Sequence, residues 1–214
     1  MKGLFVVIEG PDGSGKSTVA EGICRHFKEK GVDVIHTREP GGTAISEAVR
    51  EILLDPENKA MDPRCEALLY AAARAQHVEE VIRPALAEGA LVVSERFVFS
   101  SLVYQGLCRQ LGLAPVEAIN AFATDGLVPD ITLYLDVPEG TGKERMKDRL
   151  ADRLESDKKI TDTVEAYYRI LAERRRGELC FIDASMDAEQ VLSAAVEAIE
   201  KEYPELVTAN SPTQ

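Results

Sequence analysis

The sequence is short of basic residues. Of its 214 residues, 25 are lysine or arginine and 37 are aspartate or glutamate, so the formal net charge at pH 7 is −12. Affinity for nucleic-acid polymers comes mainly from lysine and arginine side chains that neutralise phosphates. The composition therefore argues against a protein that binds a nucleic-acid polymer. It does not argue against a small phosphorylated ligand, which needs only a few cations in one place.

Cysteines and long apolar runs are also scarce. The four cysteines are scattered, without a CxxC pair or a neighbouring histidine cluster, which argues against a zinc site or a disulfide framework. The apolar run from Leu4 to Ile8 is too short for a signal peptide or a membrane span, and no later run approaches about 18 apolar residues. We therefore expect a cytoplasmic protein that does not interact with membranes.

What the sequence does contain is a regular alternation of short apolar runs and longer amphipathic stretches. The apolar runs predict parallel strands that are buried on both faces, and the alternation predicts a sheet covered by helices on both sides. Strands are expected at residues 4–8, 32–37, 90–94, 131–136 and 179–182. Helices are expected at residues 16–30, 43–54, 64–88, 98–125, 139–153, 161–176 and 188–200.

The length fits one domain, which we place at residues 1–203. Residues 204–214 are polar and aperiodic, so they are expected to form a disordered tail. Pro115 and the glycines near it are expected to divide the stretch 98–125 into two helices.

The most specific motif follows the first predicted strand. Residues 10–17, GPDGSGKS, match GxxxxGK(S/T) at every required position and open the first predicted helix. The glycines let backbone N–H groups surround a phosphate, and the helix N-terminus adds partial positive charge. Lys16 is expected to reach the β- and γ-phosphates of ATP, and the Ser17 hydroxyl to hold Mg²⁺. The plainer alternative is a glycine-rich turn that only joins strand to helix. The residues expected to bind the ATP phosphates here are Gly10, Pro11, Asp12, Gly13, Ser14, Gly15, Lys16, Ser17 and Thr18.

The phosphate loop places the chain in an α/β, three-layer fold of the P-loop NTPase type, but it does not by itself indicate a kinase. A GTPase would carry an NKxD motif, and the nearest approach, NKAM at residues 58–61, lacks the aspartate. The size suits a small-molecule kinase better than a large remodelling ATPase.

Further segments resemble one family. TREPGGT (residues 37–43) together with IEGPDGSGKST (residues 8–18) is similar to the bacterial-type thymidylate kinases. LYAAARAQ (residues 69–76), ERF with SSLVYQG (residues 95–106) and PDITLYLDV (residues 129–137) resemble that family's segments in the same order. The resemblance implies transfer of the γ-phosphate of MgATP to dTMP, giving dTDP and ADP, by direct in-line transfer in dTTP synthesis. It also implies a homodimer.

The resemblance assigns roles to individual residues. Arg50 and Arg96 would clamp the dTMP phosphate with their planar guanidinium groups. Asp12 would accept a hydrogen bond from the sugar 3′-hydroxyl, Tyr70 would stack on thymine, and Arg74 would donate to a thymine carbonyl. The residues implied to bind dTMP are Asp12, Arg38, Glu39, Arg50, Tyr70, Arg74, Arg96, Ser100, Ser101, Tyr104 and Gln105.

Some of these residues have plainer explanations. Tyr70 lies in an apolar helical pattern and could be core, although Arg74 on the same helical face favours a polar site, because a buried arginine needs a partner. Arg50 taken alone would be an ordinary solvated helix residue. A kinase for another nucleotide, and a P-loop protein that binds nucleotide as a switch, remain the alternatives for the whole chain.

The magnesium site shows one departure from the family pattern. The family usually has Asp-Arg at the end of the third strand, whereas this chain has Glu95-Arg96. Glu95 is expected to be the acidic partner of Ser17 at Mg²⁺, directly or through water, and Asp136 is the competing candidate. No general base is required, since the attacking phosphate is an anion at neutral pH.

The resemblance also implies a short, mobile, arginine-bearing lid, at about residues 141–156, that supplies positive charge to the transition state. The phosphate loop itself contains no arginine that could do so. Arg149 is the first candidate and Arg153 the second, each also placed among the residues that bind ATP. The alternative for this run is a solvated, salt-bridged helix face. The catalytic set implied is Lys16, Arg149, Arg96 and Asp12.

Overall fold

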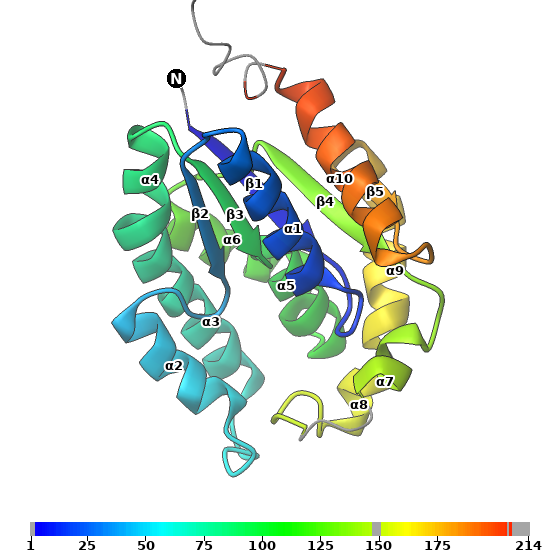
Figure 1. The fold of residues 1–214 in the computed structure, drawn as a ribbon. Helices are drawn as coiled ribbons and strands as arrows, with labels where there is room; N and C mark the ends of the chain where they lie inside the picture. Colours follow the sequence, from blue (N-terminus) through cyan, green and yellow to red (C-terminus); the bar gives the residue numbers. More distant parts are fainter. Residues whose placement is uncertain (1–2, 147–150, 205, 207–214) are drawn as a thin grey trace, which may run out of the picture.

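The five expected strands form one parallel sheet. The computed structural model describes residues 3–146, 151–204 and 206. The strand order is β2-β3-β1-β4-β5, and every neighbouring pair is parallel (Figure 1). The predicted α/β class is thereby confirmed. The strands are β1 (Leu4–Glu9), β2 (Val34–Arg38), β3 (Leu91–Glu95), β4 (Ile131–Asp136) and β5 (Cys180–Asp183).

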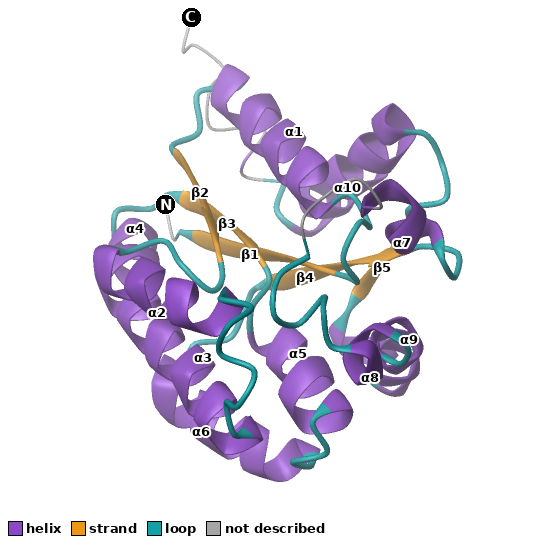
Figure 2. Ribbon diagram, turned by 90° about the horizontal axis from the view of Figure 1, so that it is seen from below, coloured by secondary structure: helices purple, strands orange, loops and turns teal. Residues whose placement is uncertain are grey.

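The central strand β1 is buried along its whole length. Its even-numbered side chains pack in the core under α1 (Lys16–Glu29) and α10 (Ala188–Glu202). Its odd-numbered side chains, Phe5 and Val7, pack in a second core on the opposite face. Figure 2 shows these two faces, with α1 and α10 on one side of the sheet and α2 to α6 and α9 on the other. A strand buried on both faces explains the unbroken apolar run in the sequence.

Polar caps fix the starts of several helices. Thr43 is the N-cap of the helix that begins at Ala44, and its side chain accepts a hydrogen bond from the Ser46 backbone N–H at 3.1 Å. Asp187 caps α10 in the same way. The remaining helical elements are α2 (Ala44–Leu54), α3 (Pro63–His77), η1 (Val78–Ile82), α4 (Arg83–Ala87), α5 (Val98–Ser101), η2 (Leu102–Cys108), α6 (Leu113–Thr124), α7 (Thr141–Met146), α8 (Lys158–Thr161), α9 (Val164–Arg174) and η3 (Arg176–Glu178).

Two of the expected helical stretches contain π-helical segments. The stretch 64–88 is interrupted by the π-helical segment η1, and the stretch 98–125 contains a second one, η2. The predicted division of 98–125 is confirmed, with Gly112 before α6 and Pro115 in its first turn, where a missing N–H is harmless. Residues 147–150 lie outside the described residues, as does most of the predicted tail.

Among the residues that the structure describes, no helix is both long and apolar enough to cross a membrane.

Candidate functional site

The loop between β1 and α1 lies at the carboxyl end of the central strand, and its backbone is closely packed. Gly13 has a φ angle of 76°, and a Cβ at this position would lie 2.6 Å from the Cα of Gly142. The Ser14 hydroxyl is buried, with no hydrogen-bond partner in the described part of the chain. A buried donor without a partner beside a helix N-terminus fits a loop built to receive an anion.

Lys16 folds back over this loop. Its Nζ donates to the carbonyl oxygens of Gly10 (3.0 Å) and Pro11 (2.8 Å). Burial, and then the nearby Arg96 charge, lower the pKa of Lys16 to about 7. A phosphate bound at the loop would place negative charge beside Lys16 and so favour its protonated, positively charged form.

Two cavities meet at the phosphate loop. The larger, about 700 Å³, runs along the loop toward Ala184, Met186 and Val191. The smaller, about 130 Å³, extends toward α3 and η2. Four residues line both cavities: Asp12, Glu39, Arg50 and Arg96. Two ligands that filled these cavities would therefore meet beside two arginines.

Arg96 is held by the chain on several sides. Its backbone has a φ angle of 70°, a conformation that residues other than glycine adopt rarely and that is enriched at functional sites. Its guanidinium donates to Asp12 Oδ1 (2.5 Å), to the Tyr168 hydroxyl (2.5 Å) and to Ser100 Oγ (2.9 Å). These bonds aim the side chain at the boundary between the cavities.

Asp12 is the anionic centre of this boundary. Its Oδ2 accepts from the Tyr104 hydroxyl at 2.8 Å, and the Lys16 ammonium lies 4.0 Å from its Oδ1. Burial raises the pKa of Asp12, but the charges of Arg96 and Lys16 outweigh it and hold the pKa well below its usual range. Asp12 is therefore a carboxylate at neutral pH.

The far end of the smaller cavity is organised around Arg74. Its Nε donates to Glu39 Oε2 at 2.6 Å, and one Nη donates to Ser101 Oγ at 3.0 Å and to Asn120 Oδ1. Glu39 Oε1 in turn lies 3.0 Å from His77 Nδ1. These buried charges are paired, so they fix a polar wall for the cavity.

The other predicted dTMP residues lie around the same space. Tyr70 and Gln105 line the smaller cavity, and Gln105 Nε2 donates to Glu66 at 2.9 Å. Arg50 lines both cavities and donates to the Pro40 carbonyl at 2.8 Å. Arg38 lines only the larger cavity, with its guanidinium paired to a glutamate of α2.

Glu95 and Ser17 are brought together at the end of β3. The Ser17 hydroxyl donates to Glu95 Oε2 at 2.5 Å, and His36 Nε2 lies 3.0 Å from Glu95 Oε1. Burial raises the pKa of Glu95, but the hydrogen bonds from His36 and Ser17 give a net lowering. The competing carboxylate, Asp136, pairs in register with Asp183 and is not among the residues that line the larger cavity.

The lid arginines are distributed differently from expectation. Arg149 lies outside the described residues. Arg153 is buried, donates to Glu66 Oε2 at 2.8 Å and is not among the residues that line the phosphate-loop cavity. Arg145, on α7, lines that cavity and donates to the Gly13 carbonyl at 3.1 Å.

Two residues of the Arg96 network were not anticipated from the sequence. Glu9 is fully buried at the end of β1, and its carboxylate accepts from the Phe97 backbone N–H at 2.8 Å and from Ser100 Oγ at 2.7 Å. Burial raises its pKa. Tyr168 comes from α9. The signal for Glu9 was a carboxylate that ends an otherwise apolar strand, whereas Tyr168 carried none.

Comparison with known proteins points to one family. The family model described as thymidylate kinase matches residues 8–195. A thymidylate kinase of Enterococcus faecalis is 47% identical over 210 residues, covering 96% of this chain and 99% of that protein. One of Lacticaseibacillus casei is 45% identical over 212 residues, with 96% and 99% covered. The crystal structure of a thymidylate kinase from Ehrlichia chaffeensis superposes with a TM-score of 0.75 at 26% identity, covering 93% of this chain and 100% of that one.

Proposed function

The chain belongs to the thymidylate kinase family and phosphorylates dTMP to dTDP, and from this premise we propose which of its residues bind the two substrates and transfer the phosphoryl group. The observation that carries the proposal is the shared wall of the two cavities, where Arg96 and Asp12 face both.

ATP occupies the larger cavity. Its phosphates lie in the loop of residues 10–18, against the backbone N–H groups and the Lys16 ammonium, and its base lies toward Ala184 and Met186. The partnerless Ser14 hydroxyl supports this placement, because a phosphate oxygen would accept its hydrogen bond.

Mg²⁺ is held by Ser17 and Glu95. A hydroxyl and a carboxylate 2.5 Å apart beside the phosphate loop fit a cation that is usually bound by one or two carboxylates together with substrate phosphates. When bound, the cation supplies positive charge to the phosphate oxygens during transfer.

dTMP occupies the smaller cavity, with its phosphate at Arg96 and Arg50 and its thymine between Tyr70 and Arg74. Ser100, Ser101, Tyr104 and Gln105 complete the lining. With Arg96 at the boundary, the acceptor phosphate lies beside the donor phosphates, which is the arrangement that direct in-line transfer requires.

Arg145 neutralises charge as the phosphoryl group moves. Its bond to the Gly13 carbonyl places a guanidinium at the phosphate loop, in a cavity whose loop contains no arginine. Arg149, four residues further along the chain, is a second candidate for the same task. Arg153 has its charge paired with Glu66 and supports the fold around the acceptor cavity.

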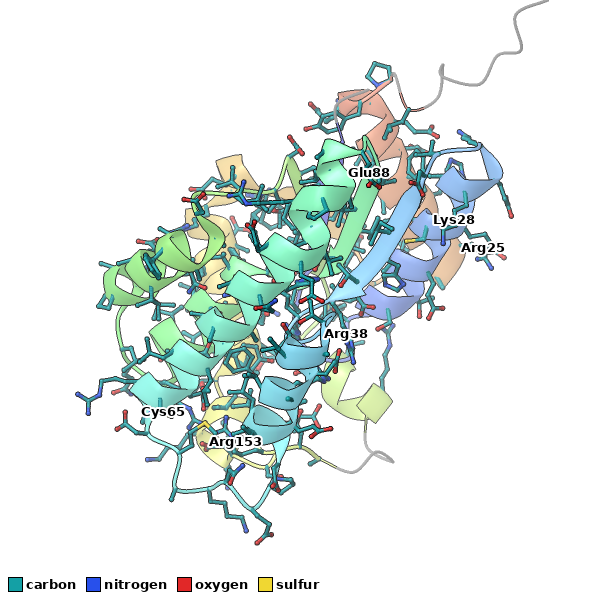
Figure 3. All side chains as sticks on the ribbon, turned by 90° about the vertical axis from the view of Figure 1, so that its left-hand side faces the viewer. Arg25, Lys28, Arg38, Cys65, Glu88 and Arg153 are labelled. Atoms are coloured by element: carbon teal, nitrogen blue, oxygen red, sulfur yellow. The ribbon has the colours of Figure 1, made fainter. Side chains whose placement is uncertain are left out.

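The chain forms a homodimer through α2, α3 and α6. On the side of the molecule that faces the viewer in Figure 3, α2 packs on α3 and α3 on α6. On these helices Leu68 is 56% exposed and Phe122 is 91% exposed, and large exposed apolar side chains are common at interfaces between protein chains. Light scattering coupled to size-exclusion chromatography tests this, since Leu68→Glu should yield monomers and an unchanged dimer would contradict it.

The enzyme works in the cytoplasm. All four cysteines are free thiols, which suits a reducing compartment.

The substrate assignment is tested with the purified protein, MgATP and, separately, dTMP, dUMP, AMP, CMP and GMP, with diphosphates quantified by chromatography.

Arg96→Ala should lower kcat/KM for dTMP by about 10²-fold or more, because charge-assisted hydrogen bonds to the phosphate are lost. The control is Arg64→Ala, an exposed arginine whose side chain pairs with Asp62. Equal losses in both variants would refute the clamp.

A further inference from the structure

His36 has no role in the proposed function so far, yet its side chain contacts Glu95, a proposed ligand of Mg²⁺. It lies in β2, which pairs with β3 so that Thr37 is opposite Ser94 and Arg38 opposite Glu95. Its Nε2 is 3.0 Å from Glu95 Oε1. The imidazole is 30% exposed and lies in none of the buried core clusters, so core packing does not explain its contact with Glu95.

The two oxygens of Glu95 are held from opposite sides. His36 holds Oε1, and the Ser17 hydroxyl holds Oε2. A glutamate side chain has three rotatable bonds, and restricting them carries an entropic cost that the metal would otherwise have to meet on binding. With Oε1 fixed by the imidazole, Oε2 alone is presented toward Ser17 and the phosphate loop.

We propose that His36 is a positioning residue, which orients the Glu95 carboxylate so that one defined oxygen faces Mg²⁺. This inference rests on the proposed role of Glu95 and Ser17. A group that hydrogen-bonds a metal ligand from outside the metal sphere commonly tunes metal affinity by about 10–100-fold. His36 is not among the residues that line the ATP cavity, so it acts through Glu95 and not on the nucleotide.

If His36 acts through the metal ligand Glu95, its loss should weaken nucleotide binding only when Mg²⁺ is present. His36→Leu removes the hydrogen bond at similar bulk, and His36→Gln retains an N–H donor. His26→Leu is the matched control, because His26 also pairs with a glutamate, Glu200, on the α1–α10 side. Calorimetric titration with ADP is run with Mg²⁺ and with a chelator.

In His36→Leu, ADP affinity with Mg²⁺ should fall about tenfold, while ADP affinity without metal stays within about twofold. The Mg²⁺ concentration for half-maximal activity should rise, with kcat at saturating Mg²⁺ unchanged. His36→Gln should recover most of the loss, and His26→Leu should show none. An equal fall with and without Mg²⁺ would overturn the inference, as would full function in His36→Leu.

A double-mutant cycle with Glu95→Asp sharpens the test. The shorter aspartate withdraws its carboxylate from the imidazole, so His36→Leu should have little further effect in that background. Additive effects would count against the inference.

Glu95→Ala separates the two proposals. If Glu95→Ala leaves the Mg²⁺ requirement unchanged, the magnesium site itself is wrong. If it raises the requirement while His36→Leu does not, only the role of His36 is overturned.

Discussion

The low pKa of Lys16 predicts that nucleotide binding takes up a proton. Burial and the Arg96 charge lower this pKa to about 7. A bound phosphate favours the charged ammonium and should return the pKa toward its ordinary value of about 10.4. At pH 8, about nine in ten free molecules carry neutral Lys16, so binding of ADP should take up about 0.9 proton, against about 0.1 at pH 6.

The direction of this pKa change determines the pH range in which ADP affinity varies. The bound form has the higher pKa, so ADP affinity should be constant below about pH 7 and fall about tenfold per pH unit above it. Proton uptake is measured by calorimetry at pH 8 in two buffers of different ionisation enthalpy. Lys16→Met, titrated to saturation, reports the protons exchanged by the nucleotide itself. Uptake below about 0.2 proton at pH 8, after this correction, would refute the argument.

Three further variants test other parts of the molecule. Arg145→Ala should lower kcat by about 10³-fold, by analogy with arginines that stabilise phosphoryl transfer, with ADP affinity nearly unchanged in titration. Glu66→Gln should lower the free energy of unfolding in urea by about 3–5 kcal/mol, because the buried guanidinium of Arg153 loses its charged partner and the half-buried Arg109 loses one of two, and exposed Glu57→Gln should have no effect. Tyr70→Leu should raise KM for dTMP about tenfold and leave KM for ATP unchanged in steady-state kinetics, since ring stacking contributes about 1–1.5 kcal/mol.

The sheet and the phosphate loop were predictable because their signals are local. The central strands β1 and β3 are buried over most of their length and are mainly apolar, and each of the five runs marked a strand to within one or two residues. The glycines of the loop are tied to the lysine and serine that follow them, and this spacing locates a helix N-terminus.

The lid was not predictable in the same way. Arg145 and Arg153 lie in one basic, helical-looking run, and nothing in their spacing says which charge is free. The difference is made by Glu66, more than 75 residues earlier, which is fully buried and pairs with Arg153. Such a pairing depends on tertiary structure, as does the bond of Tyr168 to Arg96.

The π-helical segments were hidden from the sequence for another reason. The apolar spacing in residues 98–108 suits an α-helix and a π-helix about equally over so short a stretch. The structure alone shows that η2 begins directly after Ser101 and contains Tyr104 and Gln105.

The π-helical segment η2 affects how the chain tolerates the insertion or deletion of one residue. A π-helical turn accommodates about one residue more than an α-helical turn, and each residue of an α-helix turns the chain by about 100°. Deletion of one residue between Leu102 and Cys108 could be absorbed by a return to α-helix, with the polypeptide still helical. Because the wider π-helical turn already accommodates the extra residue, its removal would leave the side chains beyond the deletion pointing in nearly the same direction relative to Ser101. A one-residue deletion in this segment would thus be tolerated better than one in a regular α-helix, where the side chains that follow would turn by about 100°.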